Sequence, residues 1–199
     1  DIVHKTIKEY IQENQYFGTN SRQFETVLLK NSPKDINWFF RTVIETRDLI
    51  DYKFGKVTKT KDSLSVNIIN KTGTNVPISL YHMKDDKVVH KSWITNITSD
   101  STIVIPRFDA DKLTLNYYNE VPEYNLRNNW KSLKGFFFNN RPFKFLFFKD
   151  LEEPHYNQLF FVPEVEFNIY DGIALGMRFN NRSILNKPFT FSATPMYSS

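Results

Sequence analysis

Residues 67–118, NIINKTGTNVPISLYHMKDDKVVHKSWITNITSDSTIVIPRFDADKLTLNYY, decide the fold. Apolar and polar residues alternate here in short runs that turn-forming residues interrupt. A run over residues 76–82 leads into the charged turn at residues 84–87, and a further run over residues 88–94 contains Trp93. Such period-two runs between turns are typical of half-buried β-strands. Roughly six or seven short strands of this kind predict a β-sandwich.

The segment before this stretch has a helical pattern instead. An apolar stripe at i, i+3/i+4 spacing predicts a helix over residues 1–16. Ser21 is expected to cap a second helix. Ser32 is expected to cap a third, with Pro33 in its first position. The third helix is too aromatic to be exposed, so we expect it to pack on the preceding helices or on something outside this chain. It carries Ile36, Trp38, Phe39, Phe40 and Val43.

Strands are also expected on both sides of the central stretch. Residues 52–57 and 64–68 form the first two strands of the sandwich, residues 101–105 a later one, and residues 113–117 the last. After a polar connector over residues 121–129, the chain becomes strongly aromatic. The aromatic runs and later strands are expected at residues 136–138, 143–148, 159–169, 172–180 and from residue 189.

The strand Gly172–Asn180 is expected to have two different faces. Ile173, Leu175, Met177 and Phe179 point one way, and the small or charged residues between them point the other way. An apolar outer face with small or charged residues inward suits the wall of a membrane-type barrel.

The expected fold class is therefore mainly β with N-terminal helices (α+β). A short helical segment is followed by a β-sandwich and then by antiparallel β-hairpins that resemble the start of a β-barrel. The expected domains are residues 1–47, 48–120 and 121–199. We also expect the chain to be a piece of a longer protein, because it starts at Asp1 and ends directly after a strand-like run.

Composition narrows the function classes. The 199 residues carry 26 Lys and Arg against 22 Asp and Glu, and this net charge of +4 is scattered along the chain. We therefore expect a mixed solvated surface and no nucleic-acid partner. The absence of cysteine excludes disulfides, thiolate metal sites and a cysteine nucleophile. No apolar run is long enough for a transmembrane helix.

None of the side chains that could carry catalysis forms a recognised motif. His82 and His90 flank the turn at Asp85 and Asp86, so they can face each other across a hairpin and form a two-histidine metal site. Solvated strand histidines are the favoured interpretation. The other histidines are His4 and His155. No H-E-x-x-H, Walker loop or dinucleotide glycine pattern is present.

The carboxylate pairs give no catalytic constellation either. Adjacent residues of a strand point to opposite faces, so neither Asp85 and Asp86 nor Glu152 and Glu153 converge if they are extended. Glu164 and Glu166 do share a face, as glycosidase carboxylates must. We interpret that face as solvated or lumen-facing. No catalytic and no metal-binding residue is predicted, and the ligand-binding residues are unknown.

One step in the helical region resembles a known family. Residues 32–40 read SPKDINWFF. They resemble the s-x-x-D-[IL]-x-W-F-F step at the end of the catalytic helical region of gluzincin zinc aminopeptidases, the family of aminopeptidase N. In that family a β-sandwich follows this step.

The remainder is similar to the C-terminal extension of large aminopeptidase-like proteins of Bacteroidetes-type bacteria. The matching pieces are PEYNLRNN at residues 122–129, KDLEEP at residues 149–154, YDG at residues 170–172 and NKPF at residues 186–189. In that group the extension resembles an outer-membrane-type β-barrel.

The resemblance implies a non-catalytic C-terminal region that supports a catalytic domain outside this chain. The zinc-binding H-E-x-x-H helix, its glutamate ligand and the substrate-recognising loop of the family are missing here, so zinc is expected only upstream. The chain alone is expected to be inactive, and its full-length parent to be a zinc aminopeptidase acting on peptides. The implied location is the cell envelope, in the periplasm or outer membrane.

Two other interpretations stay open. The chain can be a binding module whose sandwich presents Trp93 and nearby tyrosines to a glycan or a protein. It can also be a structural protein of the cell envelope. Sandwiches serve many functions, so the expected fold alone does not choose between them.

Overall fold

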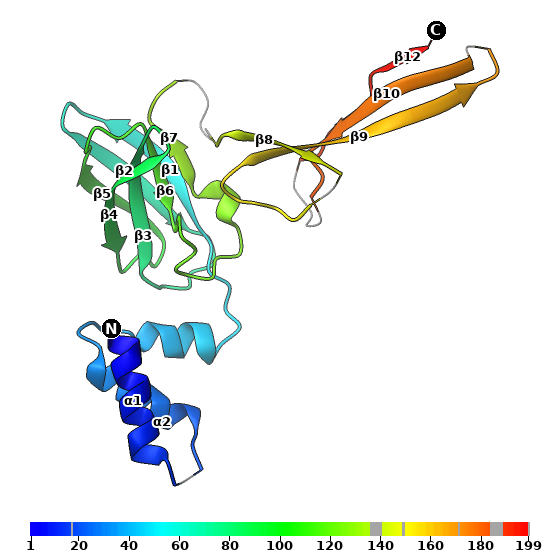
Figure 1. Ribbon diagram of the computed structural model, residues 1–199. Coiled ribbons are helices and arrows are strands. Elements are labelled where there is room, and N and C mark those ends of the chain that lie inside the picture. The colour runs from blue at the N-terminus through cyan, green and yellow to red at the C-terminus, as the bar shows by residue number, and fades with distance from the viewer. Residues whose placement is uncertain (17, 136–140, 149, 171, 184–188, 199) are drawn as a thin grey trace. The chain divides into compact units, whose positions relative to one another are not determined.

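The chain divides into two compact units, Asp1–Asn129 and Trp130–Ser199. Figure 1 shows the computed structural model of the protein. Two predicted segments lie outside the described residues: the aromatic run at residues 136–138 and most of the connection before residue 189. The expected domain boundaries after residues 47 and 120 stay predictions. The structure describes residues 1–16, 18–135, 141–148, 150–170, 172–183 and 189–198.

Two helices open the first unit and lie side by side (Figure 1). Helix α1 spans Ile2–Asn14 and α2 spans Ser21–Asn31. The prediction that Ser21 caps α2 was wrong, because Asn20 does so. The Asn20 side chain accepts from the backbone N–H of Gln23, and the Gln23 side chain accepts from the backbone N–H of Asn20. This reciprocal pair is a capping box. A cap at Ser21 would place Phe24 opposite it, and phenylalanine cannot accept a hydrogen bond.

The predicted third helix is shorter than expected and of a different kind. It is a π-helix, η1, over Phe39–Ile44. Ser32 accepts from the backbone N–H of Lys34 and so forms a local turn instead of capping a helix at Pro33. Asp35 then accepts from the backbone N–H of Asn37, where the helical turns begin.

Helix α1 turns an apolar stripe away from its partner. Its inner side packs on α2, where the rings of Tyr10 and Phe24 meet edge to face at 5.4 Å. Val3, Ile7 and Ile11 lie at i+4 spacing and are 43–57% exposed. An exposed stripe of this kind is unusual for an isolated helix pair, because apolar side chains gain free energy when they leave water.

Six strands form the predicted sandwich. One sheet has the order β1-β2-β5, and the other contains β4-β3-β6 with β3 in the middle. All pairs are antiparallel. The strands are β1 (Tyr52–Lys59), β2 (Ser63–Asn70), β3 (Ile78–Lys84), β4 (Lys87–Ile94), β5 (Asp100–Pro106) and β6 (Lys112–Leu115). The fold class predicted from the sequence is confirmed.

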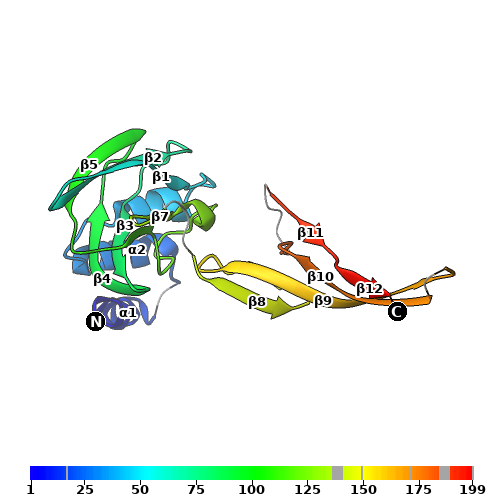
Figure 2. The same ribbon diagram turned by 90° about the horizontal axis from the view of Figure 1, so that it is seen from above.

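The core lies between these two sheets, which Figure 2 shows as separate layers. Leu64, Val66 and Ile68 occupy alternate positions of β2 and are fully buried. Ile78 and Leu80 of β3 are fully buried as well. Each such side chain stabilises the fold by about 1.5–3 kcal/mol through its removal from water.

Two backbone features set the strand ends. Asp85 and Asp86 both have positive φ, 49° and 63°, as a two-residue type I′ hairpin between β3 and β4 requires. Asn116 has φ 50° and ends β6 sooner than the predicted residue 117. The short 3-10 turn η2 (Leu126–Asn128) follows in the connector.

The second unit begins with the short strand β7 (Trp130–Ser132) and contains an open sheet in the order β11-β10-β9-β8, with β12 also paired to β10. The strands are β8 (Phe143–Phe147), β9 (Asn157–Asn168), β10 (Gly172–Asn180), β11 (Ser192–Ala193) and β12 (Met196–Ser198). One pair departs from the expected antiparallel hairpins, because β8 runs parallel to β9. No sheet formed by the described residues closes on itself.

One side of this sheet is apolar except for Asn157 at the start of β9, and we call its apolar residues the apolar sheet face. The registers place its side chains together: Phe167 opposite Ile173, Val165 opposite Leu175, and Leu175 opposite Tyr197. This confirms the two-faced pattern predicted for Gly172–Asn180. Its members are Phe143, Phe145, Phe147, Leu159, Phe161, Pro163, Val165, Phe167, Ile173, Leu175, Met177, Phe179 and Tyr197.

A search of the described helices finds none that is long and apolar enough to span a membrane.

The Tyr52 hydroxyl should be a measurable source of stability. Tyr52 is fully buried, and its oxygen accepts from the backbone N–H of Val76 at 3.1 Å. The same hydroxyl lies within hydrogen-bond distance of the Val76 carbonyl. Tyr52→Phe leaves the buried N–H without this acceptor, so we expect the free energy of unfolding to fall by about 1–3 kcal/mol. Denaturant unfolding measures it. Tyr124→Phe, at a 73% exposed ring, is the matched control and should change stability by less than about 0.5 kcal/mol.

Candidate functional site: an aromatic platform on the sandwich

The outer face of the sheet β4-β3-β6 carries a cluster of aromatic and charged side chains. Trp93 pairs with Ser79, and Lys91 pairs with Tyr81, so all four project from the same side of β3 and β4. The chain after β6 adds Tyr117, Tyr118 and Glu120, which contact Ser79 or Tyr81. We call this cluster the aromatic platform, and it comprises Ser79, Tyr81, Lys91, Trp93, Tyr117, Tyr118 and Glu120.

Glu120 is the centre of the platform. Its carboxylate accepts from the Tyr81 hydroxyl at 2.5 Å, from the Ser79 hydroxyl and from the Lys91 ammonium. Ser79 and Tyr81 are both buried in the middle strand. The carboxylate is therefore held in one place by three donors, two of which belong to the rigid interior of the sheet.

Aromatic rings surround this charged pair. The Lys91 nitrogen lies 5.4 Å from the centre of the Tyr81 ring and 5.1 Å from that of Trp93, which is within cation–π range. The Tyr81 ring also meets Tyr117 at 5.8 Å and Tyr118 at 5.5 Å. Trp93 is 41% exposed and Tyr118 is 64% exposed, so two rings of the platform are open to a ligand.

The platform groups are charged at neutral pH. Partial burial works against ionisation of Glu120, but the hydrogen bonds from Lys91, Ser79 and Tyr81 outweigh it and lower the pKa of Glu120. Partial burial likewise opposes the charge of Lys91, but its bonds to Glu120 and Tyr81 raise the pKa of Lys91. The surface thus offers a fixed anion and a fixed cation beside exposed rings.

The two histidines predicted to face each other do so. His82 lies directly opposite His90 in the β3–β4 register, with ring centres 5.5 Å apart, and Phe108 stacks on His90 at 4.0 Å. His82 is buried, so the interpretation of this residue as a solvated strand histidine was wrong. Burial first, and then the neighbouring His90, lowers the pKa of His82 to about 4. The described residues contain no group of three or more metal-ligating side chains.

A second buried titratable group ties the connector to the sandwich. Glu123 accepts from the backbone N–H of Tyr52 at 2.9 Å, from the Asn116 amide at 2.9 Å and from the Asn129 amide at 2.6 Å. Burial raises the pKa of Glu123 to about 7, although these three donors oppose the shift and nearby Asp51 adds to it. The residues expected to form a polar connector are therefore fastened to the fold.

The remaining predicted carboxylates are structural. Glu164 and Glu166 share a face of β9 as predicted, and Glu164 forms an ion pair with Arg178 of β10. Glu153 pairs with Lys144 at 2.7 Å. Asp86 pairs with Lys112 at 2.5 Å.

The other two histidines named from the sequence, His4 and His155, lie outside the platform. His4 is exposed on α1. The His155 ring meets Trp130 edge to face at 6.0 Å. The platform does not contain either of them.

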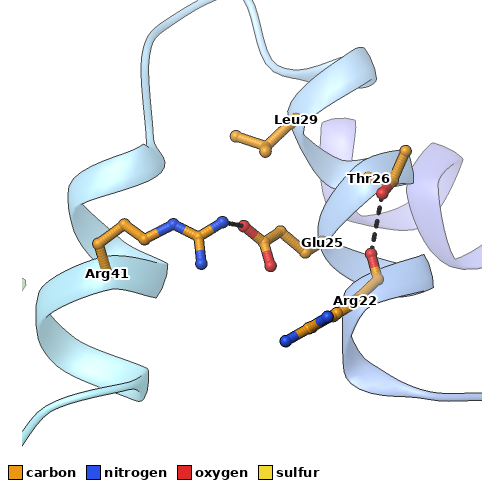
Figure 3. A pocket seen from close by; sticks show the side chains of 5 residues that line it. All are labelled: Arg22, Glu25, Thr26, Leu29 and Arg41. Atoms are coloured by element: carbon orange, nitrogen blue, oxygen red, sulfur yellow. Dashed lines mark hydrogen bonds and ion pairs between the residues drawn. The ribbon is translucent and has the colours of Figure 1, made fainter.

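A hollow between α2 and η1 is a concave feature of the first unit (Figure 3). Arg22, Glu25, Thr26 and Leu29 of α2 and Arg41 of η1 line it. Arg41 donates to the largely buried Glu25 at 2.6 Å and also binds Glu45. The charged groups at the centre of the hollow, Arg41 and Glu25, are therefore paired with each other. We interpret the hollow as a contact that holds η1 against α2.

Sequence reasoning named Trp93 and its tyrosines but missed Glu120 and Lys91. A long-range contact brings Glu120 to β3, and nothing local marks it. The available signal was the period of two, which places Ser79, Tyr81 and Met83 on one side of β3 and so makes the Tyr81 face partly polar.

Comparisons with protein families, with curated proteins and with solved structures found no match to this chain.

His82 and Glu123 should give opposite pH dependences of stability. Between about pH 4 and 6.5, unfolded His82 binds a proton that the folded form does not, so this group makes stability rise with pH. Between about pH 4.5 and 7, folded Glu123 holds a proton that the unfolded form has lost, so this group makes stability fall with pH. The two slopes oppose each other over most of this window.

Each substitution should expose the slope of the other group. We expect His82→Gln to make the free energy of unfolding fall more steeply with pH than in the wild type, and Glu123→Gln to make it rise more steeply. Each difference should approach about 1.4 kcal/mol per pH unit. Urea unfolding at half-unit steps from pH 4 to 7.5 measures it. Slopes that move in the same direction in both variants would contradict the assignment.

Proposed function

We propose that this chain is a non-catalytic binding module that holds a carbohydrate on its aromatic platform. The observation that carries the proposal is the pair of exposed rings, Trp93 and Tyr118, beside a fixed Lys91–Glu120 ion pair. The C–H face of a sugar ring packs well on an aromatic ring, and its hydroxyls hydrogen-bond to charged side chains.

Pre-organisation supports this assignment. Glu120 is held by Ser79 and Tyr81, which are fixed in the central strand, so little side-chain entropy is lost when a ligand arrives. Recognition of hydroxyl groups also needs donors and acceptors close to the ring surface, and Lys91 with Glu120 offers both. A purely apolar protein ligand would gain nothing from this buried polar network.

Removal of the Trp93 ring should abolish most of the binding. We expect Trp93→Ala to weaken the affinity for a bound polysaccharide at least tenfold, which is about 1.4 kcal/mol, because the main stacking surface is lost. Isothermal titration against a panel of soluble polysaccharides measures the affinity. Tyr124→Ala removes another exposed ring of the same unit outside the platform and should bind like the wild type. A panel without any binder would contradict the carbohydrate assignment.

A second role follows from the resemblance to gluzincin aminopeptidases. We propose that residues 1–47 close a zinc aminopeptidase-like catalytic domain that lies outside this chain, within the cell envelope. The favouring observation is the exposed stripe Val3, Ile7 and Ile11 on α1, which a neighbouring domain would cover. Zinc and all catalytic residues would then belong to that domain, which would act on peptides. The two roles are compatible.

The native polypeptide tests the second role. We expect its intact mass from the source cells to be far above the 23.6 kDa of this sequence and its metal content to be close to one zinc ion per chain. Intact mass spectrometry and elemental analysis provide both values. A native mass near 23.6 kDa would remove the catalytic domain and with it the supporting role, but it would leave the carbohydrate proposal intact.

A further inference from the structure

The apolar sheet face of the second unit is exposed to a degree that solvated sheets avoid. At its centre, Val165 and Phe167 of β9 are 68% and 74% exposed, and Ile173 and Leu175 of β10 are 58% and 61% exposed. The register places Phe167 opposite Ile173 and Val165 opposite Leu175, so the four side chains form one contiguous patch. A contiguous exposed patch of this kind marks an interaction surface.

The charged residues of the same two strands are all on the other side. Glu164, Glu166 and Arg178 alternate with the patch residues, and Glu164 and Arg178 form an ion pair with each other. No member of the apolar sheet face, as defined by its residues above, carries a charge. All charged side chains of these strands are thus kept off the apolar sheet face, although Phe160, Val162 and Ala174 share the charged side.

The backbone of the central strands is paired on both sides over part of its length: β8 pairs with residues 157–161 of β9, and β11 and β12 pair with residues 179–180 and 174–176 of β10. β9 lies between β8 and β10, and β10 lies between β9 and the short strands β11 and β12. Gly176 permits the approach of β12, because a Cβ atom there would come within 2.5 Å of the Pro195 carbonyl oxygen. A hydrocarbon environment demands such pairing, since it offers no hydrogen bonds to exposed N–H and C=O groups.

The length of the strands fits the same environment. β10 has 9 residues and β9 has 12. A tilted strand of about 9–11 residues crosses the hydrocarbon core of a bilayer. β10 is therefore long enough to present its apolar residues over the full depth of that core.

We infer that the apolar sheet face contacts the acyl chains of a lipid bilayer. A protein partner is disfavoured because protein interfaces carry about one hydrogen bond per 100–200 Å² of buried area. On this side of the sheet, the side chains that can donate or accept one are the Tyr197 hydroxyl and the Asn157 amide, and the amide already donates to the Arg141 carbonyl at 2.8 Å. The inference is independent of the carbohydrate platform, since it concerns the other unit.

Flotation with vesicles of zwitterionic phosphatidylcholine tests the inference, because these vesicles give the net positive charge of the chain no attraction. The full chain should float with the vesicles. Leu175→Lys should lower its partition coefficient at least tenfold, since a charged side chain at the centre of a lipid-facing strand is strongly disfavoured. Ala174→Lys adds the same charge to the neighbouring position on the opposite face, where Glu166 lies across the strand pair, and should float like the wild type.

Two results would overturn the inference. One is a wild-type chain that stays at the bottom of the gradient. The other is an equal loss of flotation in both variants. Sedimentation velocity without lipid identifies the competing occupant: a concentration-dependent dimer that Leu175→Lys abolishes, in a chain that does not float, would make this face an interface between two copies. Circular dichroism of each variant confirms that the strands are retained.

Discussion

The buried carboxyl of Glu123 holds the sandwich together at the point where its strands begin and end. It receives donors from the start of β1, from the residue that ends β6 and from the connector, through Tyr52, Asn116 and Asn129. A buried acceptor with three donors is costly to disturb, because each donor left without a partner loses about 1–3 kcal/mol. Tyr52 extends this hydrogen-bond network to β3, because its hydroxyl bonds to the backbone of Val76 just before that strand.

The aromatic platform depends on the same contacts. Asn116 leaves the strand geometry with φ 50°, and its side chain bonds both the N–H and the carbonyl of Val121. This closes residues 116–121 into a loop that returns over the outer face of β3, where Glu120 meets Ser79 and Tyr81. The position of the Glu120 carboxylate is thus a consequence of the network around Glu123.

The sequence predicted which segments form helices and which form strands much better than it predicted where each segment begins and ends. Alternation located all six sandwich strands and the two faces of β10, because a strand with one buried side leaves that pattern in the sequence. The cap at Asn20 instead of Ser21 was missed, because it depends on the reciprocal bond with Gln23. The π-helix and the parallel pairing of β8 with β9 were also missed, since neither has a local signal of comparable strength.

The candidate site was only half predictable for a similar reason. Exposed aromatic residues on a strand are visible in the sequence, and Trp93 was identified in this way. The rest of the site depends on the contacts of Glu120 with Tyr81 and Ser79, which lie 39 and 41 residues before it in the sequence. No spacing rule connects residues at that separation, and only the folded chain brings them together.

The proposal that the aromatic platform binds a carbohydrate is tested most directly by heteronuclear NMR. The isotope-labelled chain is titrated with a polysaccharide to which it binds. We expect the largest chemical-shift changes at the Trp93 indole and at the backbone amides of β3, residues 91–93 and residues 117–120. Shifts of the same size on the sheet β1-β2-β5, with the Trp93 indole unchanged, would contradict it.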